Sequence, residues 1–365
     1  RNMKAKIQLS DHFTYGKLLR FTLPSIVMMV FTSIYSVVDG FFISNFAGKT
    51  AFAALNLIWP FLMILGGMGF MIGTGGTALV SRCLGAGQKE RARRYFSMLV
   101  EFTALLGLIL TAIGLIFMEP IARFLGATEE MIPDCVLYGR IVIAFNVAFM
   151  FQNVFQSFLI AAEKPRLGLA ATVSAGVTNM VLDALLVGVF RWGLAGAALA
   201  TGLSQTVGAV IPMVFFLNRE NGSALHFSFT PMEAHPLLQA CGNGASELMS
   251  NISGSIAAMV YNFQLLKFLG EDGVSAYGVI MYVGFIFVAI FVGYSIGSAP
   301  IISFHFGAEN REELKNMFRK SYLLMAVWGI AMALAAYLLA GPLAKLFVGY
   351  DRELCELTTH AMGLY

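Results

Sequence analysis

Long apolar runs separated by short polar loops dominate this chain. The runs are about 20 residues or longer, which is the length that an α-helix needs to cross roughly 30 Å of hydrocarbon. They lack the short alternating segments that are typical of a transmembrane β-barrel. The pattern therefore predicts an all-α polytopic membrane protein. Its helices are expected at residues 18–43, 53–80, 95–117, 135–161, 167–190, 194–217, 237–266, 274–304, 317–340 and from about 353.

The polar loop after the second predicted helix recurs after the eighth. Residues 81–90 match residues 303–312 with a constant shift of 222, without a gap. The same shift aligns three further pairs: Gly48 with Gly270, Phe96 with Phe318, and Pro120 with Pro342. We infer that one ancestral unit is used twice. Because six helices return the chain to the side from which it started, the two repeats are expected to be parallel.

The repeat also predicts the domain organisation. We expect an N-terminal lobe at residues 1–217, a cytoplasmic linker at 218–235, and a C-terminal lobe at 236–365. The shift places Tyr365 opposite Ile143, within the fourth helix of the repeat. We therefore expect the second repeat to be truncated here after about ten spans, and the complete protein to have twelve.

Composition and charge support this class and suggest an orientation. Hydrophobic residues make up 58% of the chain and charged residues 12%, against about half and a quarter in soluble proteins. Seventeen of the 24 Lys and Arg residues fall on the side of the N-terminus, which predicts a cytoplasmic N-terminus in the inner (plasma) membrane. The net charge of +3 then reflects topology and not nucleic-acid binding. The four cysteines form no CxxC and have no nearby His, so no metal or redox site is predicted, and we expect no Cys135–Cys355 disulfide.

A first group of polar residues lies within predicted helices of the N-terminal lobe. A carboxylate in hydrocarbon costs a few kcal/mol, so it usually faces a cavity or a partner. At about 1.5 Å per residue, the group sits roughly 6 to 10 Å below the outer helix ends. Two carboxylates with an amide and a hydroxyl predict a site for a hard cation or for a proton. A hydrogen-bonded cluster that only fixes helix packing is the alternative. The predicted coupling-cation residues are Asp39, Asn179, Asp183 and Thr201.

Further polar residues predict a substrate cavity. Asn243, Glu247 and Asn251 recur every four residues on one face of the helix at 237–266. Glu247 could carry a proton, anchor a cationic substrate or pair with an amide. The remaining predicted cavity residues are Tyr35 in the first helix and Asn153 and Gln156 in the fourth, for which hydrogen bonding between helices is nearly as good an explanation.

The two repeats differ at these positions. The shift of 222 places Ser25 opposite Glu247, and Tyr261 opposite Asp39. We interpret this difference as a division of labour, in which the first repeat binds the coupling ion. Glu101, near the basic loop after the second helix, is expected to pair with an Arg of that loop.

Several classes of activity find no support in the sequence. No Walker sequence, HExxH or GxSxG occurs, so neither ATP-driven transport nor hydrolysis is indicated. A membrane-embedded enzyme is disfavoured because the five His residues fall in loops or at helix ends. No cofactor is expected beyond a coupling Na⁺ or H⁺. The 32 Phe and 20 Met are compatible with a pocket of broad specificity for organic cations.

Taken together, these residues resemble the multidrug and toxic compound extrusion (MATE) family, in particular its bacterial branch. The segments that carry the resemblance are 23–24, 38–44, 81–87, 162–165 and 299–308, together with Asn179 and Asp183. The resemblance implies a twelve-span, V-shaped bundle of two lobes that exports drugs, toxic organic cations or metabolites in exchange for Na⁺ or H⁺. It also implies that a cation site is formed by Asp39, Asn179, Asp183 and Thr201. Glu247 matches the acidic residue that one subgroup of the family has in its seventh helix.

The resemblance sets expectations about partners and alternatives as well. We expect small organic, cationic substrates, the lipid bilayer as surroundings, a monomer, and no metal beyond Na⁺ at Asp39, Asn179 and Asp183. A flippase for a lipid-linked oligosaccharide, from the same superfamily, is the alternative function. It would need cationic residues inside the cavity to hold pyrophosphate, and the predicted spans contain hardly any Lys or Arg.

Overall fold

The computed structural model describes residues 6–365 except 48 and 350, and this part of the chain is helical with no strand. The all-α class predicted from the sequence is therefore confirmed. Two short π-helical segments, η1 and η2, extend α1 and α6. The elements are α1 (Tyr15–Phe42), η1 (Ile43–Ala47), α2 (Lys49–Gly85), α3 (Lys89–Phe124), α4 (Ile132–Ala144), α5 (Asn146–Ala161), α6 (Pro165–Leu182), η2 (Asp183–Val189), α7 (Gly193–Leu217), α8 (Ala234–Gly307), α9 (Arg311–Val348) and α10 (Arg352–Leu364).

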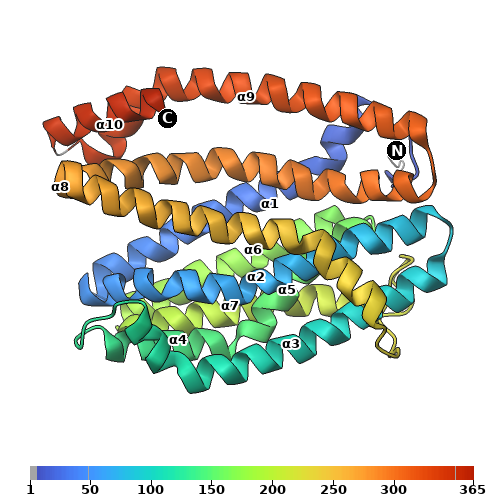
Figure 1. Ribbon diagram of the computed structural model, residues 1–365, viewed down its shortest axis with the longest axis horizontal. Helices are drawn as coiled ribbons and strands as arrows, with labels where there is room; N and C mark the ends of the chain where they lie inside the picture. Colours follow the sequence, from blue (N-terminus) through green and yellow to red (C-terminus); the bar gives the residue numbers. More distant parts are fainter. Residues whose placement is uncertain (1–5, 48, 350) are drawn as a thin grey trace.

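Most helices lie where the apolar runs predicted them, with two differences. The helix predicted at 135–161 is divided into α4 and α5, which are bent by 51° relative to each other. Phe145 leaves helical geometry at this break, with φ −98° and ψ 9°. The element α8 contains two predicted helices, and Figure 1 shows that it runs out and back as a hairpin. We call the part that starts at Ala234 the first leg and the part that ends at Gly307 the second leg.

Length and hydropathy identify the membrane spans. Within the described residues, seven helical segments are long and apolar enough to cross a membrane, and the bent α4–α5 pair can form an eighth span. The first leg of α8 and α10, which has 13 residues, do not meet the same criterion. The multi-pass class is therefore clear, whereas the count of ten spans stays a prediction.

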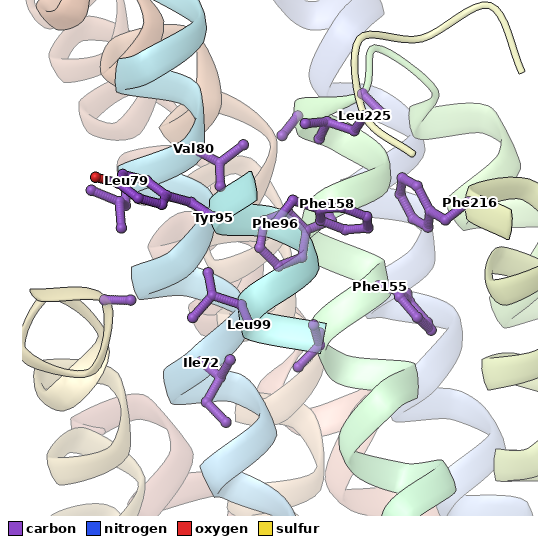
Figure 2. Packing of buried hydrophobic residues seen from close by; sticks show 14 of the residues in the cluster. Ile72, Leu79, Val80, Tyr95, Phe96, Leu99, Phe155, Phe158, Phe216 and Leu225 are labelled. Carbon is purple, nitrogen blue, oxygen red and sulfur yellow. The ribbon is translucent and has the colours of Figure 1, made fainter. Parts of the chain in front are cut away.

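Aromatic packing holds the helices of the N-terminal lobe together. Figure 2 shows Phe96 of α3 next to Phe158 of α5, with Phe216 of α7 close by. The ring centroid of Phe96 lies 5.0 Å from that of Phe158 and 4.7 Å from that of Phe216. All three side chains are buried. In lipid the surroundings are as apolar as the side chains, so such contacts stabilise the bundle by close packing and not by removal of water.

The predicted linker lies along α3. The Ser228 N–H donates to Ser97 Oγ (3.1 Å), and the Thr230 N–H donates to Glu101 Oε1 (2.9 Å). The prediction that Glu101 pairs with an Arg was wrong, because its carboxylate accepts this backbone N–H instead. A non-helical segment needs external acceptors for its N–H groups, and Glu101 supplies one.

Candidate functional site

The two intramembrane aspartates of the N-terminal lobe meet where regular helix gives way to π-helix. Asp39 lies near the end of α1, just before η1, and Asp183 is the first residue of η2. π-Helical turns rearrange the backbone hydrogen bonds and often occur at functional sites. The two carboxyl groups interact with each other, although the Asp183 oxygens form no regular hydrogen bond with any described group. The depth argument from the sequence therefore placed both acids in one site.

Side chains of α6 and α7 complete one side of this site. Asn179 of α6 and Thr201 and Ser204 of α7 are all buried. Asn179 Nδ2 donates to Ser204 Oγ at 3.4 Å, and Ser204 donates to the Thr201 carbonyl oxygen at 2.7 Å. The Asn179 side-chain oxygen and the Thr201 hydroxyl form no regular hydrogen bond with a described residue.

Tyr138 of α4 is a site residue that the sequence analysis missed. It is fully buried, and it lies within interaction range of Asp39, Asp183 and Thr201. In the sequence it occurs among apolar residues and reads as part of a core helix. The hydroxyl of Tyr138 could have indicated a polar site, because a phenol deep in a bundle normally finds a polar partner.

The shared property of this site is a set of buried oxygens that form no regular hydrogen bond with described residues but interact with one another, Asp39 with Asp183 and Tyr138 with Thr201. An unpaired buried oxygen costs about 1 to 3 kcal/mol, so several in one place indicate a ligand or protons that satisfy them. All of them are carboxylate, amide, hydroxyl or phenol oxygens, which are the donor atoms that a hard cation prefers. They are Asp39 Oδ1, Tyr138 Oη, Asn179 Oδ1, Asp183 Oδ1, Asp183 Oδ2 and Thr201 Oγ1.

The predicted cavity residues of the N-terminal lobe lie on helix contacts. Tyr35 of α1 is half-buried, interacts with Asp39, and packs on Phe31 with ring centroids 5.7 Å apart. Asn153 is buried and its amide donates to the Gly66 carbonyl oxygen at 3.4 Å. Gln156 reaches the Met29 sulfur at 3.8 Å. These contacts join α5 to α2 and α1, as the helix-packing explanation expects.

A small cavity lies next to these residues in the same lobe. It is lined by residues of α2, α4, α5 and α7, with Asn146 and Gln205 as its polar side chains. It offers about 10 Å³ to the centre of a water molecule, which is room for about one water. Gln205 Oε1 is buried without a described partner, so a single water is a suitable occupant.

The polar stripe on the first leg of α8 is separate and more open. Asn243 and Asn251 are exposed and Glu247 is half-buried. No hydrogen bond or ion pair of Glu247 occurs within the described part of the chain. The positions that the shift of 222 pairs with Glu247 and Asp39 differ in exposure: Ser25, paired with Glu247, is 1% exposed, and Tyr261, paired with Asp39, is 58% exposed.

The fold and the site together define a multi-pass helical membrane protein with an oxygen-lined acidic site buried in its N-terminal half. A family model narrows this class. The MatE family model matches residues 24–185 and 248–365, which is more than half of the chain. The chain belongs to the MatE family. The two matched segments begin 224 residues apart (24 and 248), close to the shift of the internal repeat.

Curated relatives are similar over most of the chain. The multidrug export protein MepA of Staphylococcus aureus is 22% identical over 345 residues, which cover 94% of this chain and 76% of MepA. MepA of Staphylococcus saprophyticus is 22% identical over 310 residues, covering 85% of this chain and 68% of the relative. The names of these relatives describe export and not an enzymatic reaction, in line with the expectation that this protein is no enzyme.

Solved structures share the fold. An outward-facing multidrug resistance MATE transporter of the MOP superfamily has a TM-score of 0.91 at 21% identity, covering 100% of this chain and 81% of that one. A MOP superfamily transporter from Pyrococcus furiosus has a TM-score of 0.88 at 22% identity, covering 100% and 83%. A crystal structure of MATE in complex with MaL6 has a TM-score of 0.90 at 22% identity, covering 99% and 80%.

Proposed function

We propose that this protein is a secondary active antiporter that exports small organic compounds in exchange for Na⁺ or H⁺ by alternating access. The observation that carries the proposal is the interacting pair of half-buried Asp39 and buried Asp183, next to buried oxygens that form no regular hydrogen bond with a described residue. The family assignment and the export names of the MepA relatives support the direction of transport.

The coupling step follows from the electrostatics of the site. Charge interactions are stronger in the low dielectric of a helix bundle than in water, so two adjacent carboxylates bind a cation or share a proton strongly. A cation that enters under 100 mV brings about 2.3 kcal/mol. This free energy drives export only if the cation and the substrate prefer different conformations of the lobes. Asp39, Asn179, Asp183 and Thr201 are the residues that we assign to the cation.

The substrate contacts are assigned to the more open polar residues. Glu247 is accessible and has no described partner, so its carboxylate is available to an organic cation, with Asn243 and Asn251 on the same face. From the N-terminal half, half-buried Tyr35 and Gln156 are the proposed contacts, whereas buried Asn153, which bonds to Gly66, is assigned to the contact of α5 with α2. Acids, amides and hydroxyls favour a cationic substrate over the pyrophosphate that a flippase would hold.

The orientation and assembly complete the proposal. The basic loops after α2 and α8 lie at one end of the bundle, which we assign to the cytoplasm because Lys and Arg resist translocation. The N-terminus then lies in the cytoplasm and the protein spans the plasma membrane as a monomer.

Efflux of a fluorescent organic cation from vesicles tests this function. The purified protein is reconstituted, and efflux is followed under an imposed Na⁺ gradient and then under an imposed pH gradient. We expect one of these gradients to drive efflux, and Asp39→Asn to reduce that driven efflux at least tenfold, since a single charge–charge interaction in such a site exceeds about 1.4 kcal/mol.

The matched control is Glu353→Gln, which changes an exposed acid at the start of α10 and should leave efflux unchanged. Full gradient-driven efflux by Asp39→Asn, or wild-type efflux that neither gradient drives, would overturn the proposal.

A further inference from the structure

The segment that precedes α1 crosses from one predicted lobe to the other. We call residues 7–14 the strap. Its Leu9 is 1% exposed and its Phe13 is fully buried, although the segment has no regular secondary structure. Both side chains pack in one cluster with Ile160 of α5, from the N-terminal lobe, and with residues of the C-terminal lobe: Tyr294, Ile301 and Met317. The strap therefore fills the space between the lobes.

Acids of both lobes hold the backbone of the strap. The Leu9 N–H donates to Glu163 Oε1 at 2.8 Å, in the turn between α5 and α6. The Phe13 N–H donates to Glu313 Oε1 at 2.9 Å, and Asn316 Nδ2 donates to the Phe13 carbonyl oxygen at 2.9 Å. Glu313 and Asn316 belong to α9, in the C-terminal lobe. An irregular segment is thus hydrogen-bonded to each lobe at a separate point.

Glu313 is the principal anchor of the strap. It is 5% exposed, and besides the Phe13 N–H its carboxylate accepts from Asn316 Nδ2 at 2.8 Å and contacts His12 Nδ1 at 2.6 Å. A buried carboxylate is stable only with such partners, and hydrogen bonds to a charged acceptor are the stronger ones. Two of its three partners, Phe13 and His12, are strap residues, so Glu313 loses them when the strap leaves.

The end of α8 that lies next to the strap also packs against α2. A Cβ atom added to Gly85 of α2 would overlap the Phe304 carbonyl oxygen, and one added to Gly307 would overlap the Arg82 carbonyl oxygen. The shift of 222 relates Gly85 to Gly307 and Arg82 to Phe304, so the same contact is made from both repeats. Without side chains at these glycines, α2 and the second leg of α8 approach closely.

His305 links the two contacts. It is 2% exposed and lies near the backbone of Leu9 and Asp11 in the strap, although neither ring nitrogen forms a regular hydrogen bond with a described group. The end of α8 is therefore enclosed between α2 on one face and the strap on another.

The opposite end of the bundle lacks such contacts among the described residues. A Cβ atom added to Gly254 of the first leg would meet nothing within 4 Å. Asn251 is exposed nearby, Tyr261 is 58% exposed, and Ile34 in the outer part of α1 is 47% exposed. Close contact between the lobes thus lies in the half of the bundle that carries the basic loops and the strap, where a Cβ atom added to Gly75 would also overlap Ala240 and one added to Gly293 would overlap Ile26.

We propose that the strap fastens the two lobes at the basic end, and that its release from Glu313 is a step in opening that end. This inference rests on the proposed alternating access, because only a transporter that opens at both ends must break the contact. In this state the strap and the Gly85–Gly307 contact keep the basic end shut.

Two readouts, each compared with and without Glu313→Ala, test the proposal. The first is the rate at which a thiol at Leu9→Cys reacts with maleimide, which reports strap release. The second is the distance between spin labels at Lys89→Cys and Arg311→Cys, two exposed positions related by the shift of 222, which reports lobe separation. Both use the full chain in lipid nanodiscs, with the native cysteines replaced, in the absence of substrate and gradient.

We expect Glu313→Ala to raise the labelling rate about tenfold, as the loss of hydrogen bonds to a charged group implies, and to increase the population with long label distances. Glu313→Gln keeps an acceptor for the Phe13 N–H and should have a smaller effect. Glu312→Ala is the matched control, because this neighbouring acid is exposed. If Glu313→Ala does not fold, Asn316→Ala should shift both readouts in the same direction to a smaller extent.

Two results would overturn the proposal. Unchanged labelling in Glu313→Ala would show that this carboxylate does not hold the strap. Faster labelling with unchanged label distances would show that the strap packs locally and does not fasten the lobes. Neither readout depends on transport, so failure here is distinguishable from failure of the antiport proposal, which the gradient-driven efflux of Asp39→Asn tests separately.

Discussion

Asp183 and Glu247 are both acids within predicted helices of the membrane, but their surroundings differ. Asp183 is 0% exposed, and both of its oxygens lie among other oxygens that have no described hydrogen-bond partner. Glu247 is half-buried on a face that also exposes Asn243 and Asn251. A fully enclosed acid can exchange only a small cation or a proton, whereas an accessible acid can contact a large organic cation. This contrast supports the division of labour between the two repeats.

The positions that the shift of 222 pairs with Glu247 and Asp39 have different surroundings. Ser25, opposite Glu247, is 1% exposed, and its hydroxyl would lie 3.2 Å from a Cβ atom added to Gly297. Tyr261, opposite Asp39, is exposed and stacks on Tyr277 with ring centroids 5.6 Å apart. The packing of each repeat therefore determines at which position an acid can be accommodated. Placing an acid at the equivalent position of the other repeat tests this directly.

The largest effect is expected when the acid of the second repeat is placed in the first. Ser25→Glu puts a carboxylate into the closely packed contact of α1 with α8, where an unpaired buried charge costs several kcal/mol. We expect little folded protein, measured as the monodisperse fraction after detergent extraction. Tyr261→Glu, at an exposed position, should fold as the unmodified chain does. A normal yield of Ser25→Glu would contradict the packing described for this position.

Asp183→Asn should separate transport from stability. The substitution removes a charge that is buried without a described hydrogen-bond partner, so we expect gradient-driven efflux to fall at least tenfold while the melting temperature rises by several degrees. The rise follows because Asn removes the repulsion between two adjacent carboxylates, which is worth more than about 1 kcal/mol in a low dielectric. Efflux from vesicles and thermal unfolding of the purified protein measure the two effects. A lower melting temperature would indicate that Asp183 is a structural acid.

Glu247→Gln should change the substrate side and not the ion side. We expect KM for a cationic substrate to rise about tenfold, since an accessible charge contact is worth on the order of 1 kcal/mol. Export of a neutral substrate and the response to the driving gradient should be unchanged. Initial rates of efflux over a range of substrate concentrations provide the measurement, and Glu353→Gln provides the control. Loss of ion coupling in Glu247→Gln would reverse the assigned division of labour.

Tyr138→Phe should have the smallest effect of the series. It removes one hydroxyl from the oxygen-lined site and keeps the ring in place, so cation affinity should fall about fivefold, as the loss of one hydrogen-bonding or ligating oxygen implies. Stability should be unchanged or slightly higher, because the hydroxyl has no described partner. The concentration of cation that gives half-maximal efflux reports the affinity. A change in substrate KM at constant cation affinity would place Tyr138 in the substrate path instead.

The sequence was most informative where a single physical constraint decides the outcome. Apolar runs long enough to span lipid located the helices, although the ends of α3 and α9 extend six to eight residues beyond the predicted ranges. The depth of Asp39 and Asp183 predicted that these acids meet. The break at Phe145 was missed because the run around it is apolar throughout, and hydropathy does not report a local departure from helical dihedrals. The π-helical segments η1, which follows Asp39 in the chain, and η2, which begins at Asp183, were missed for the same reason.

Residues whose role depends on a distant neighbour were also beyond the reach of the sequence. Tyr138 becomes a site residue only because α4 packs against α7, which carries Thr201, and this places the phenol within interaction range of Asp39 and Asp183. Glu101, twelve residues into α3, and Glu313, in the first turn of α9, both follow basic loops, where pairing with Arg is the simplest expectation. Both nevertheless hold the backbone of irregular segments that come from elsewhere in the chain. Tertiary structure, and not local pattern, determines which partner such an acid finds.

The central claim, that the oxygens around Asp39 and Asp183 bind the coupling cation, is tested most directly by calorimetry on the purified protein in the absence of substrate. Na⁺ is titrated at several pH values in buffers of different ionisation enthalpy, so that both Na⁺ binding and proton release are measured. The account predicts a saturable Na⁺ or proton binding event in the unmodified chain that Asp183→Asn abolishes and that Glu247→Gln retains. The same binding event in Asp183→Asn, or its loss in Glu247→Gln alone, would contradict it.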